Sequence, residues 1–179
     1  MKTNRLELLP HAPEHLLALI ESPAAYQSAV GVRPAVELRD FVVGPEVSPD
    51  FLAKLNSESG QDPGVYGPWM YGFVLVQRVE RNAIGLASFK GPPSDEGMVE
   101  IAYGIVPLHQ NRGYATEAAQ ALLEYAFASG QVRMVIAHTL PEPSASTKVL
   151  GKCGFKQVGE VIDPEDGLVW RWEKARDAH

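Results

Sequence analysis

The first part of the chain alternates short apolar stretches with frequent breaks. Residues 5–9 are typical of a strand that ends at Pro10. Residues 13–20 then place three apolar side chains on one face of a helix: Leu16, Leu17 and Ile20.

Residues 24–69 are rich in proline and glycine, which predicts mostly loop. Within this stretch, Ser48-Pro49-Asp50 is a typical helix start because serine caps helices well and proline fits their first turn. We expect a short helix over residues 51–55 and loop elsewhere.

The pattern from residue 71 onward predicts a sheet. Residues 71–79, 83–90 and 98–106 are apolar runs, separated by a polar turn at 80–82 and a longer turn at 91–97. Short polar connections favour neighbouring antiparallel strands. We therefore expect these three strands to form an antiparallel meander.

The last part of the chain alternates helices and strands. Residues 116–127 have one apolar face and end near Gly130, and residues 132–139 form a very apolar strand that we expect to be central. A strand, a helix and a strand in succession favour a right-handed crossover. A second helix over 144–152 precedes strands at 155–162 and 168–173, which are joined by a turn. The fold class is therefore α+β with a mainly antiparallel sheet, in one domain over residues 1–179.

Composition narrows the function. The chain has 45% apolar and 21% charged residues, as is ordinary for a globular protein, and its net charge of -6 argues against a general nucleic-acid binder. Cys153 is the single cysteine, so no internal disulfide can form, and we expect no metal site. No apolar run approaches about 18 residues, so we expect no membrane contact. The first ten residues lack a signal-peptide core, so we expect a cytoplasmic protein.

One turn carries candidate chemistry. "HQNRGYATEA", residues 109–118, separates an apolar strand from a helix, so the free N–H groups of that helix meet at one point and favour an anion. Gly113 allows close approach, Arg112 adds a forked cation and Thr116 adds a hydroxyl. We interpret residues 110–116 as a phosphate cradle. The alternative is a plain turn with a solvated arginine. G-x-x-x-x-G-K-S/T and G-x-G-x-x-G are both absent, which argues against a P-loop and a dinucleotide fold.

The sequence also resembles a known family. Residues 110–115, QNRGYA, resemble the Q/R-x-x-G-x-G/A signature of the GNAT acetyltransferase superfamily, and "GYATEA" resembles its RimJ/RimL-like branch. That branch also begins with a strand like "TNRLELLP" and ends with Ser-x-x-Val-Leu before Lys-x-Gly-Phe. Here Ser146 begins the first of these motifs and Phe155 ends the second.

The resemblance implies a mixed, mainly antiparallel sheet with helices on both faces and a cleft for acetyl-CoA where two strands splay apart. The third meander strand would pair with pantetheine, and the N–H of Ile105 would polarise the thioester carbonyl. The turn would hold the diphosphate. The implied cofactor-binding residues are Tyr103, Gly104, Ile105, Gln110, Asn111, Arg112, Gly113, Tyr114, Ala115 and Thr116.

The family's chemistry needs a base for the attacking amine and an acid for the departing thiolate. For the base, His138 and Glu100 both stand on predicted strands, and a water chain is a third option. For the acid, Ser146 matches a serine of the RimJ/RimL-like branch. Each has a plainer alternative: a packed histidine, a solvent-facing carboxylate and a helix-start serine. The chain departs from the family at Leu150, where many members have the acid tyrosine, and at Pro143, where an asparagine is frequent.

These features predict an N-acetyltransferase that uses acetyl-CoA and acts on a primary amine, either a protein N-terminus or a small amine. Residues 24–69 would shape the variable acceptor side. One rival is a non-catalytic acyl-CoA sensor with the same fold. A weaker rival is an unrelated nucleotide-phosphate-binding domain. An exposed last strand would allow a homodimer.

Overall fold

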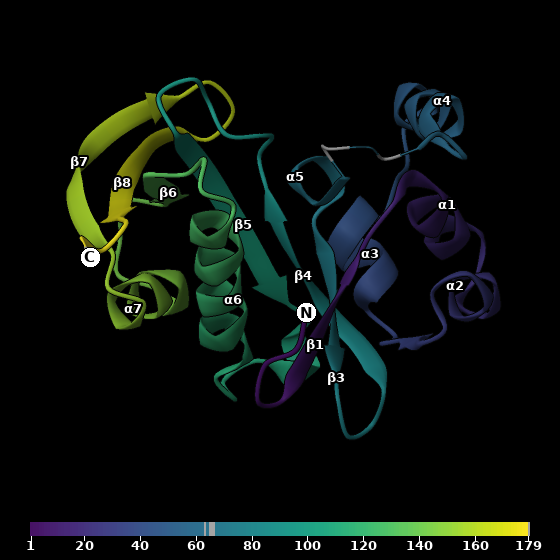
Figure 1. The fold of residues 1–179 in the computed structure, drawn as a ribbon. Coiled ribbons are helices and arrows are strands. Elements are labelled where there is room, and N and C mark those ends of the chain that lie inside the picture. The colour runs from purple at the N-terminus through teal and green to yellow at the C-terminus, as the bar shows by residue number, and fades with distance from the viewer. Residues whose placement is uncertain (63, 65–66, 179) are drawn as a thin grey trace.

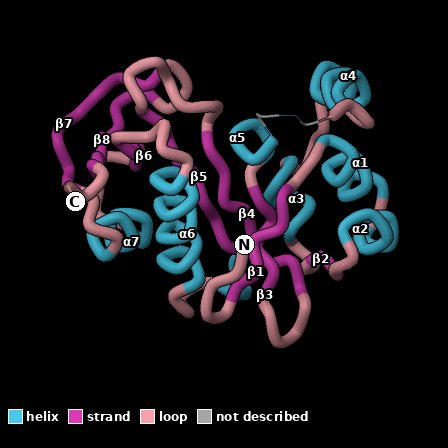
Figure 2. The backbone as a smooth tube through the Cα atoms, viewed as in Figure 1, coloured by secondary structure: helices cyan, strands magenta, loops and turns pink. Residues whose placement is uncertain are grey.

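The computed structural model describes residues 1–62, 64 and 67–178. Its centre is an eight-stranded twisted sheet (Figures 1 and 2). The strands are β1 (Leu6–Pro10), β2 (Arg33–Pro34), β3 (Phe73–Gln77), β4 (Asn82–Phe89), β5 (Met98–Ile105), β6 (Met134–Thr139), β7 (Lys156–Asp163) and β8 (Gly167–Ala175). Their order is β1-β3-β4-β5-β6-β8-β7, with the short β2 beside β4. The β5–β6 and β2–β4 pairs are parallel and the other pairs are antiparallel.

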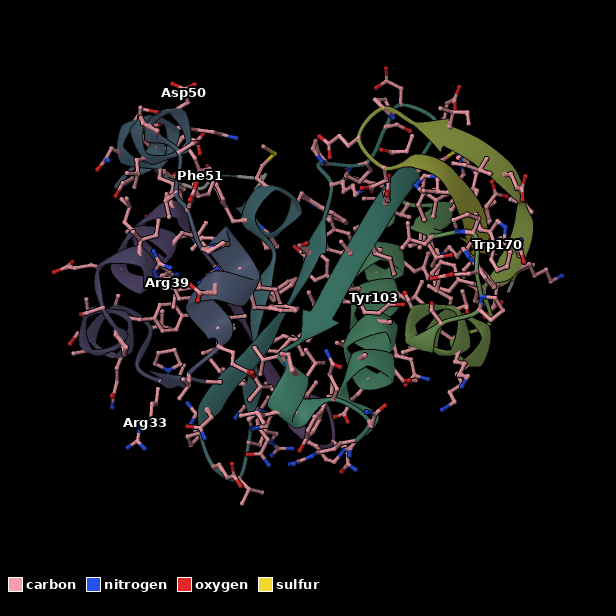
Figure 3. All side chains as sticks on the ribbon, turned by 180° about the vertical axis from the view of Figure 1, so that it is seen from behind. Arg33, Arg39, Asp50, Phe51, Tyr103 and Trp170 are labelled. Atoms are coloured by element: carbon pink, nitrogen blue, oxygen red, sulfur yellow. The ribbon has the colours of Figure 1, made fainter. Side chains whose placement is uncertain are left out.

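Helices cover both faces of this sheet. They are α1 (Pro13–Glu21), α2 (Pro23–Val30), α3 (Leu38–Val43), α4 (Pro49–Glu58), α5 (Gly67–Tyr71), α6 (Tyr114–Ala128) and α7 (Ala145–Lys152). Helices α6 and α7 stand in front of the sheet in Figure 1, whereas α3 stands in front in the reversed view of Figure 3. The expected α+β class, with helices on both faces, is confirmed.

The antiparallel meander β3-β4-β5 and the parallel crossover from β5 through α6 to β6 are also confirmed. The β5–β6 pair is short. It joins only Met98, Val99 and Glu100 of β5 to β6, and the rest of β5 stays paired with β4 alone. The two strands therefore separate after Glu100, which opens the sheet beside the last residues of β5.

Helix α6 fixes one wall of this opening. Its apolar face is buried against the sheet, with Ala118, Leu122 and Ala126 fully covered. Gly113 precedes the helix in the left-handed conformation, at φ 81°, where glycine is unstrained. The helix thus begins two residues before the expected residue 116, directly after the turn.

Mostly loop was the wrong expectation for residues 24–69. The structure has α2, α3, α4 and α5 within or overlapping this range, while residues 63, 65 and 66 lie outside the described residues. The prolines open helices instead of breaking them: Ser22 caps α2 and Ser48 caps α4, each followed by proline. The predicted start at Ser48 is confirmed, although α4 continues to Glu58.

The predicted strand start at Tyr71 was also wrong, because Tyr71 ends α5 and β3 begins at Phe73. Gly72 forms the corner between them, at φ 65°. A Cβ there would lie 2.6 Å from the Ser88 Cβ and 2.7 Å from the Ala87 oxygen, so the backbone of β4 comes too close for any side chain.

The last strand, β8, is not exposed at a sheet edge as expected. It lies between β6 and β7, and β7 forms that edge of the sheet. The chain first forms the edge strand β7 and then returns as β8 between β7 and β6. The strand that comes last in the sequence is therefore paired on both sides.

Candidate active site

A cavity of about 460 Å³ lies where β5 leaves β6. Its walls are the end of β5, the turn before α6, the first turn of α6 and one face of α7. Its lining is Tyr103, Gly104, Ile105, His109, Gln110, Asn111, Gly113, Tyr114, Ala115, Thr116, Ala145, Ser146, Lys148, Val149 and Lys152. Nine of the ten residues expected to hold a cofactor are therefore brought together here.

The hydrogen-bond register shows which backbone groups of β5 face this cavity. Lys90 N donates to Glu100 O and Val106 N donates to Ile84 O, so the even residues of β5 are bonded to β4. In an antiparallel pair, bonded and non-bonded residues alternate. The N–H groups of Tyr103 and Ile105 therefore point away from β4, toward the opening.

The turn leaves further N–H groups available. Asn111 and Gly113, on either side of Arg112, have left-handed φ angles of 60° and 81°, and turns that contain such residues form anion-binding concavities. Gly113 is the N-cap of α6, and among the described residues no side chain forms a capping hydrogen bond there. The first helical N–H groups, from Tyr114 to Thr116, are thus free for an anion at the positive end of the helix dipole. Gln110 ties the turn to β5, since its Nε2 donates to Ile105 O at 2.9 Å.

The charge of the lining is one-sided. Lys148 and Lys152 line it, and none of the lining residues carries a carboxylate, although the chain as a whole has a net charge of -6. Arg112, the cation expected in the cradle, is outside the described lining. Its Nη2 lies 3.3 Å from Leu108 O on the exposed side of the turn. The structure therefore places the positive charge of the cavity on α7.

Sequence reasoning missed these lysines, together with His109, Ala145 and Val149. A signal was present: Lys148 and Lys152 are four residues apart, and residues at this spacing share one helix face. Nothing in the local pattern indicated that this face would meet the turn before α6, because α7 and that turn are brought together only by the sheet.

Ser146 lines the cavity beside Tyr103, with 3.4 Å between their hydroxyl oxygens. Ser144 and Thr147, not Ser146, form the capping box of α7, so Ser146 is not the backbone-binding helix cap that was its plainer alternative. Burial raises the pKa of Tyr103 to about 12. The cavity thus contains two neighbouring protonated hydroxyls.

Glu100 and His138, expected as alternative bases, form one hydrogen-bonded pair. The His138 Nδ1 lies 3.0 Å from Glu100 Oε1, and Lys90 Nζ lies 2.7 Å from the same oxygen. Glu100 and Gly104 share a strand face, and a Cβ on Gly104 would lie 2.5 Å from Phe41 Cζ of α3. The pair therefore lies on the α3 side of the sheet, at the point where β5 and β6 separate, outside the described lining of the cavity.

The contacts of this pair define the state of the imidazole. A carboxylate beside an ammonium group accepts hydrogen bonds, so Nδ1 of a neutral His138 carries the proton and donates it to Glu100. Nε2 then has a free lone pair. This atom is buried and has no hydrogen-bond partner among the described residues. An oriented imidazole whose Nε2 has no hydrogen-bond partner is suited to accept a proton.

The lining fits a long, anionic ligand that carries amide groups. Free strand N–H groups suit amide-bearing chains, and the turn with two lysines suits phosphates. In the described part of the chain, no cluster of three metal-ligating side chains occurs. None of the helices that the structure describes is long and apolar enough to cross a membrane.

Comparison with known proteins agrees with this geometry. The family model described as "Acetyltransferase (GNAT) domain" matches residues 5–156. A relative from Bacillus subtilis (strain 168), "Uncharacterized N-acetyltransferase YjdG", is 29% identical over 106 residues, which cover 59% of this chain and 58% of the relative. The match thus spans less than two thirds of that protein.

Solved structures share the fold. A GNAT-family acetyltransferase from Bacillus anthracis is 23% identical with a TM-score of 0.64, and the match covers 98% of this chain and 97% of that one. The ribosomal L7/L12 acetyltransferase RimL, solved with coenzyme A, is 15% identical with a TM-score of 0.66, covering 99% and 97%. Because the family model spans most of the sequence and the sheet opens as described, the chain belongs to the GNAT acetyltransferase domain family.

Proposed function

We propose that this protein is an acetyl-CoA-dependent N-acetyltransferase of the RimJ/RimL-like kind, acting on a primary amine. One observation carries the proposal: the cavity at the β5–β6 opening combines free backbone N–H groups with two lysines and no carboxylate in its described lining. The two lysines would form no ion pair with a neutral metabolite, and they would repel a cationic one.

The residues of the cavity divide the binding among them. The N–H groups of the turn and the first turn of α6 hold the diphosphate, with Lys148 and Lys152 supplying positive charge. The outward groups of Tyr103 and Ile105 pair with the pantetheine amides. When bound, acetyl-CoA supplies an activated acetyl thioester. The N–H of Ile105 is available to its carbonyl oxygen as negative charge develops there.

Proton transfer is assigned to two sets of side chains. Nε2 of His138 accepts the proton that the attacking amine loses, while Glu100 holds the ring through Nδ1. Ser146, with Tyr103 beside it, donates a proton toward the thiolate. Ser146 lies one helical turn before Leu150, the position at which many family members have a tyrosine.

The acceptor side is assigned to α3 and the helices around it. The exposed ring of Phe41 covers Gly104 on the same face of β5 as the Glu100–His138 pair, so this face offers an incoming amine both an aromatic surface and a base. A protein N-terminus or a small amine would fit this description. RimL, whose fold is similar, is described as an alpha-N-protein acetyltransferase.

The experiment is amine-dependent release of the CoA thiol, measured with acetyl-CoA and a panel of peptides and polyamines. The proposal predicts that at least one primary amine accelerates release above the hydrolytic background and that His138→Gln reduces this acceleration by about 100-fold. A protein that binds acetyl-CoA but shows no acceleration with any amine would instead be the non-catalytic sensor.

A further inference from the structure

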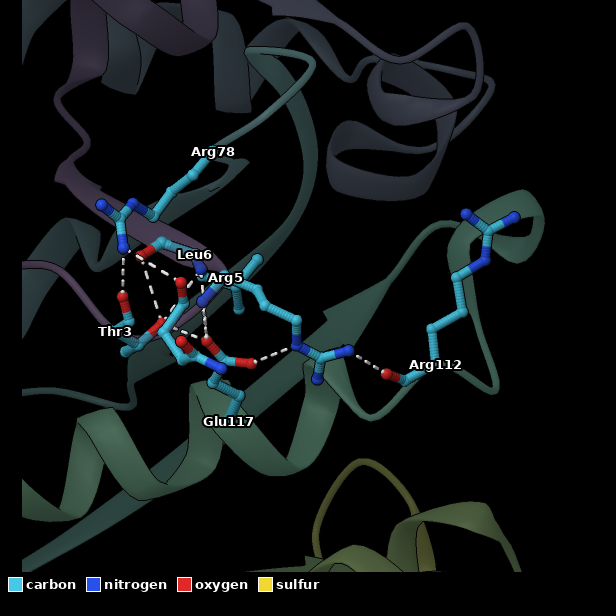
Figure 4. A network of polar contacts seen from close by, with 7 residues as sticks. Thr3, Arg5, Leu6, Arg78, Arg112 and Glu117 are labelled. Carbon is cyan, nitrogen blue, oxygen red and sulfur yellow. Dashed lines mark hydrogen bonds and ion pairs between the residues drawn. The ribbon is translucent and has the colours of Figure 1, made fainter.

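The first residues of the chain contact the phosphate cradle, residues 110–116, from outside the cavity. Arg5, just before β1, donates from Nη1 to the carbonyl oxygen of Arg112 at 2.6 Å. Its guanidinium carbon also lies 4.7 Å from the centre of the Tyr114 ring. Figure 4 shows the Arg5 guanidinium between the Glu117 carboxylate and the Arg112 carbonyl, while the Arg112 side chain extends away from it. Arg5 is not among the described residues of the cavity lining.

A carboxylate on α6 holds Arg5 in this position. Oε2 of Glu117 accepts from Arg5 Nε at 3.0 Å, and its Oε1 accepts from the Arg5 N–H at 2.6 Å. The Thr3 hydroxyl and the Leu6 N–H also donate to Oε1. Burial acts to raise the pKa of Glu117, but the hydrogen bonds from Thr3 and Arg5 outweigh it and lower the pKa. Glu117 is therefore ionised and balances the charge of Arg5.

The contact falls on the part of the turn where backbone geometry matters most. Arg112 lies between Asn111 and Gly113, the two left-handed residues that orient the following N–H groups. A Cβ on Gly113 would lie 3.0 Å from Arg5 Nη2, so the guanidinium also backs the glycine. Fixing the Arg112 carbonyl fixes the peptide plane that contains the N–H of Gly113.

We propose that Arg5 is a positioning residue for the CoA cradle: it holds residues 111–114 in their binding shape through the Arg112 carbonyl and the Tyr114 ring. The inference rests on the proposed function, because it assigns Arg5 to the diphosphate part of that site. Since Glu117 balances its charge, Arg5 acts by geometry and not as a phosphate ligand.

Arg5→Gln tests the inference, with Arg78→Gln as a matched control. Arg78 binds the same N-terminal segment, donating to Thr3 O at 2.8 Å and Asn4 O at 3.0 Å, but it does not contact the turn. Two measurements are made on each variant: amide hydrogen exchange in the free protein of Gln110 and Glu117, whose N–H groups donate to Pro107 O and Gly113 O at the two ends of the turn, and the Kd for coenzyme A by calorimetry. Thermal unfolding reports any general loss of stability.

Arg5→Gln should speed exchange in the turn and weaken coenzyme A binding by about tenfold, the worth of one hydrogen bond from a charged group. Arg78→Gln should leave both unchanged. Binding of a pantetheine fragment without phosphates should be the same in the two variants. Unchanged exchange and affinity in a folded Arg5→Gln protein would overturn the inference. Failure of the wild-type protein to bind coenzyme A would overturn the proposed function instead, whereas the exchange result stands without ligand.

Discussion

Lys90, His138 and Glu100 meet at one carboxylate oxygen, and this sharing divides their roles. Hydrogen bonding to Glu100 raises the pKa of Lys90, so the ammonium group persists beside this carboxyl group. Both partners bind the same oxygen of Glu100, Oε1, whereas Nε2 of His138 has no hydrogen-bond partner among the described residues. At the scale of single residues, we therefore propose His138 as the proton acceptor and Glu100 as its support.

This assignment predicts different effects for two isosteric changes. His138→Gln should lower kcat by about 100-fold with an unchanged Kd for acetyl-CoA, because the proton acceptor is lost while the cradle is intact. Glu100→Gln should cost less, since an amide oxygen still accepts from Nδ1. Steady-state kinetics and calorimetry check both. An equal loss in the two variants would make Glu100 the base, and full activity of His138→Gln would favour a water chain.

The close neighbours of Gly72 determine how much a substitution there should lower the free energy of unfolding. Gly72→Ala adds a Cβ within 2.6 Å of Ser88 Cβ at a left-handed φ of 65°, and should cost about 3 kcal/mol or more. Gly31→Ala is the control: its φ is 83°, but no described atom lies within 4 Å of the new Cβ, so only backbone strain of about 1 kcal/mol applies. Urea unfolding compares them. Equal losses would show that β4 yields to the new methyl group.

At the scale of elements, the cavity joins the start of α6 to one face of α7. Helix α6 supplies N–H groups and its dipole, and α7 supplies Lys148 and Lys152 one turn apart. Neither helix alone combines free N–H groups with lysine side chains. Their combination depends on β6, which carries the chain from the end of α6 to the start of α7 across the sheet.

The charge of α7 leads to a prediction about affinity. Lys152→Glu should raise the Kd for acetyl-CoA by about tenfold, and the loss should shrink as salt is added, because exposed charges are screened. Lys156→Glu makes the same charge change on the exposed edge strand β7, outside the described lining, and should have little effect. Equal effects of the two variants at all salt concentrations would contradict a role for α7 in phosphate binding.

Local patterns predicted the elements that carry the site. The third meander strand, the turn at Gly113 and the helix after it follow from an apolar run, a glycine and a helical face in sequence. The prediction for residues 24–69 failed in part because proline has two opposite meanings. The cap was recognised at Ser48-Pro49, but Pro23 also opens a helix, which is evident only when Ser22 before it is weighed as a cap.

Pairings between distant residues were beyond local patterns. Glu100 and His138 were both candidates, but their pairing depends on the register of β5 and β6, two parallel strands joined through a helix. Arg5 and Glu117 lie 112 residues apart along the chain. The placement of Arg112 outside the cavity follows from the path of the turn, which composition does not encode.

At the scale of the whole molecule, a buried histidine ties the first helices to the sheet. His11 follows β1, and its Nε2 lies 3.0 Å from the Tyr26 hydroxyl of α2. Burial raises the pKa of Tyr26, so the phenol donates and Nε2 accepts. Burial, with a smaller effect of His15, lowers the pKa of His11 to about 3. The folded protein therefore keeps His11 neutral well below the pH at which an exposed histidine is protonated.

The consequence is loss of stability in acid. Between about pH 6.5 and pH 3 the unfolded chain binds a proton at His11, whereas the folded protein does not. As the pH is lowered through this range, this group therefore lowers the free energy of unfolding by up to about 1.4 kcal/mol per pH unit. Urea unfolding at several pH values should show a smaller slope for His11→Gln than for wild type. His15→Gln, at a half-buried site, should change the slope less. Identical slopes in wild type and His11→Gln would contradict the burial of a neutral ring.

The same architecture separates the two halves of the proposed reaction. The cradle and the Tyr103–Ser146 hydroxyls are on the α6 and α7 side, and the Glu100–His138 pair is on the α3 side. Both lie beside the opening of the sheet after Glu100. The account as a whole therefore depends on whether that opening holds acetyl-CoA.

Calorimetric titration of the purified protein with acetyl-CoA, with ATP and NAD as controls, tests this most directly. The account predicts one acetyl-CoA bound per chain and affinities for ATP and NAD at least about tenfold weaker, because neither control carries a pantetheine arm for β5. No binding of acetyl-CoA, or equal binding of all three ligands, would contradict the assignment of the cavity and, with it, the proposed activity.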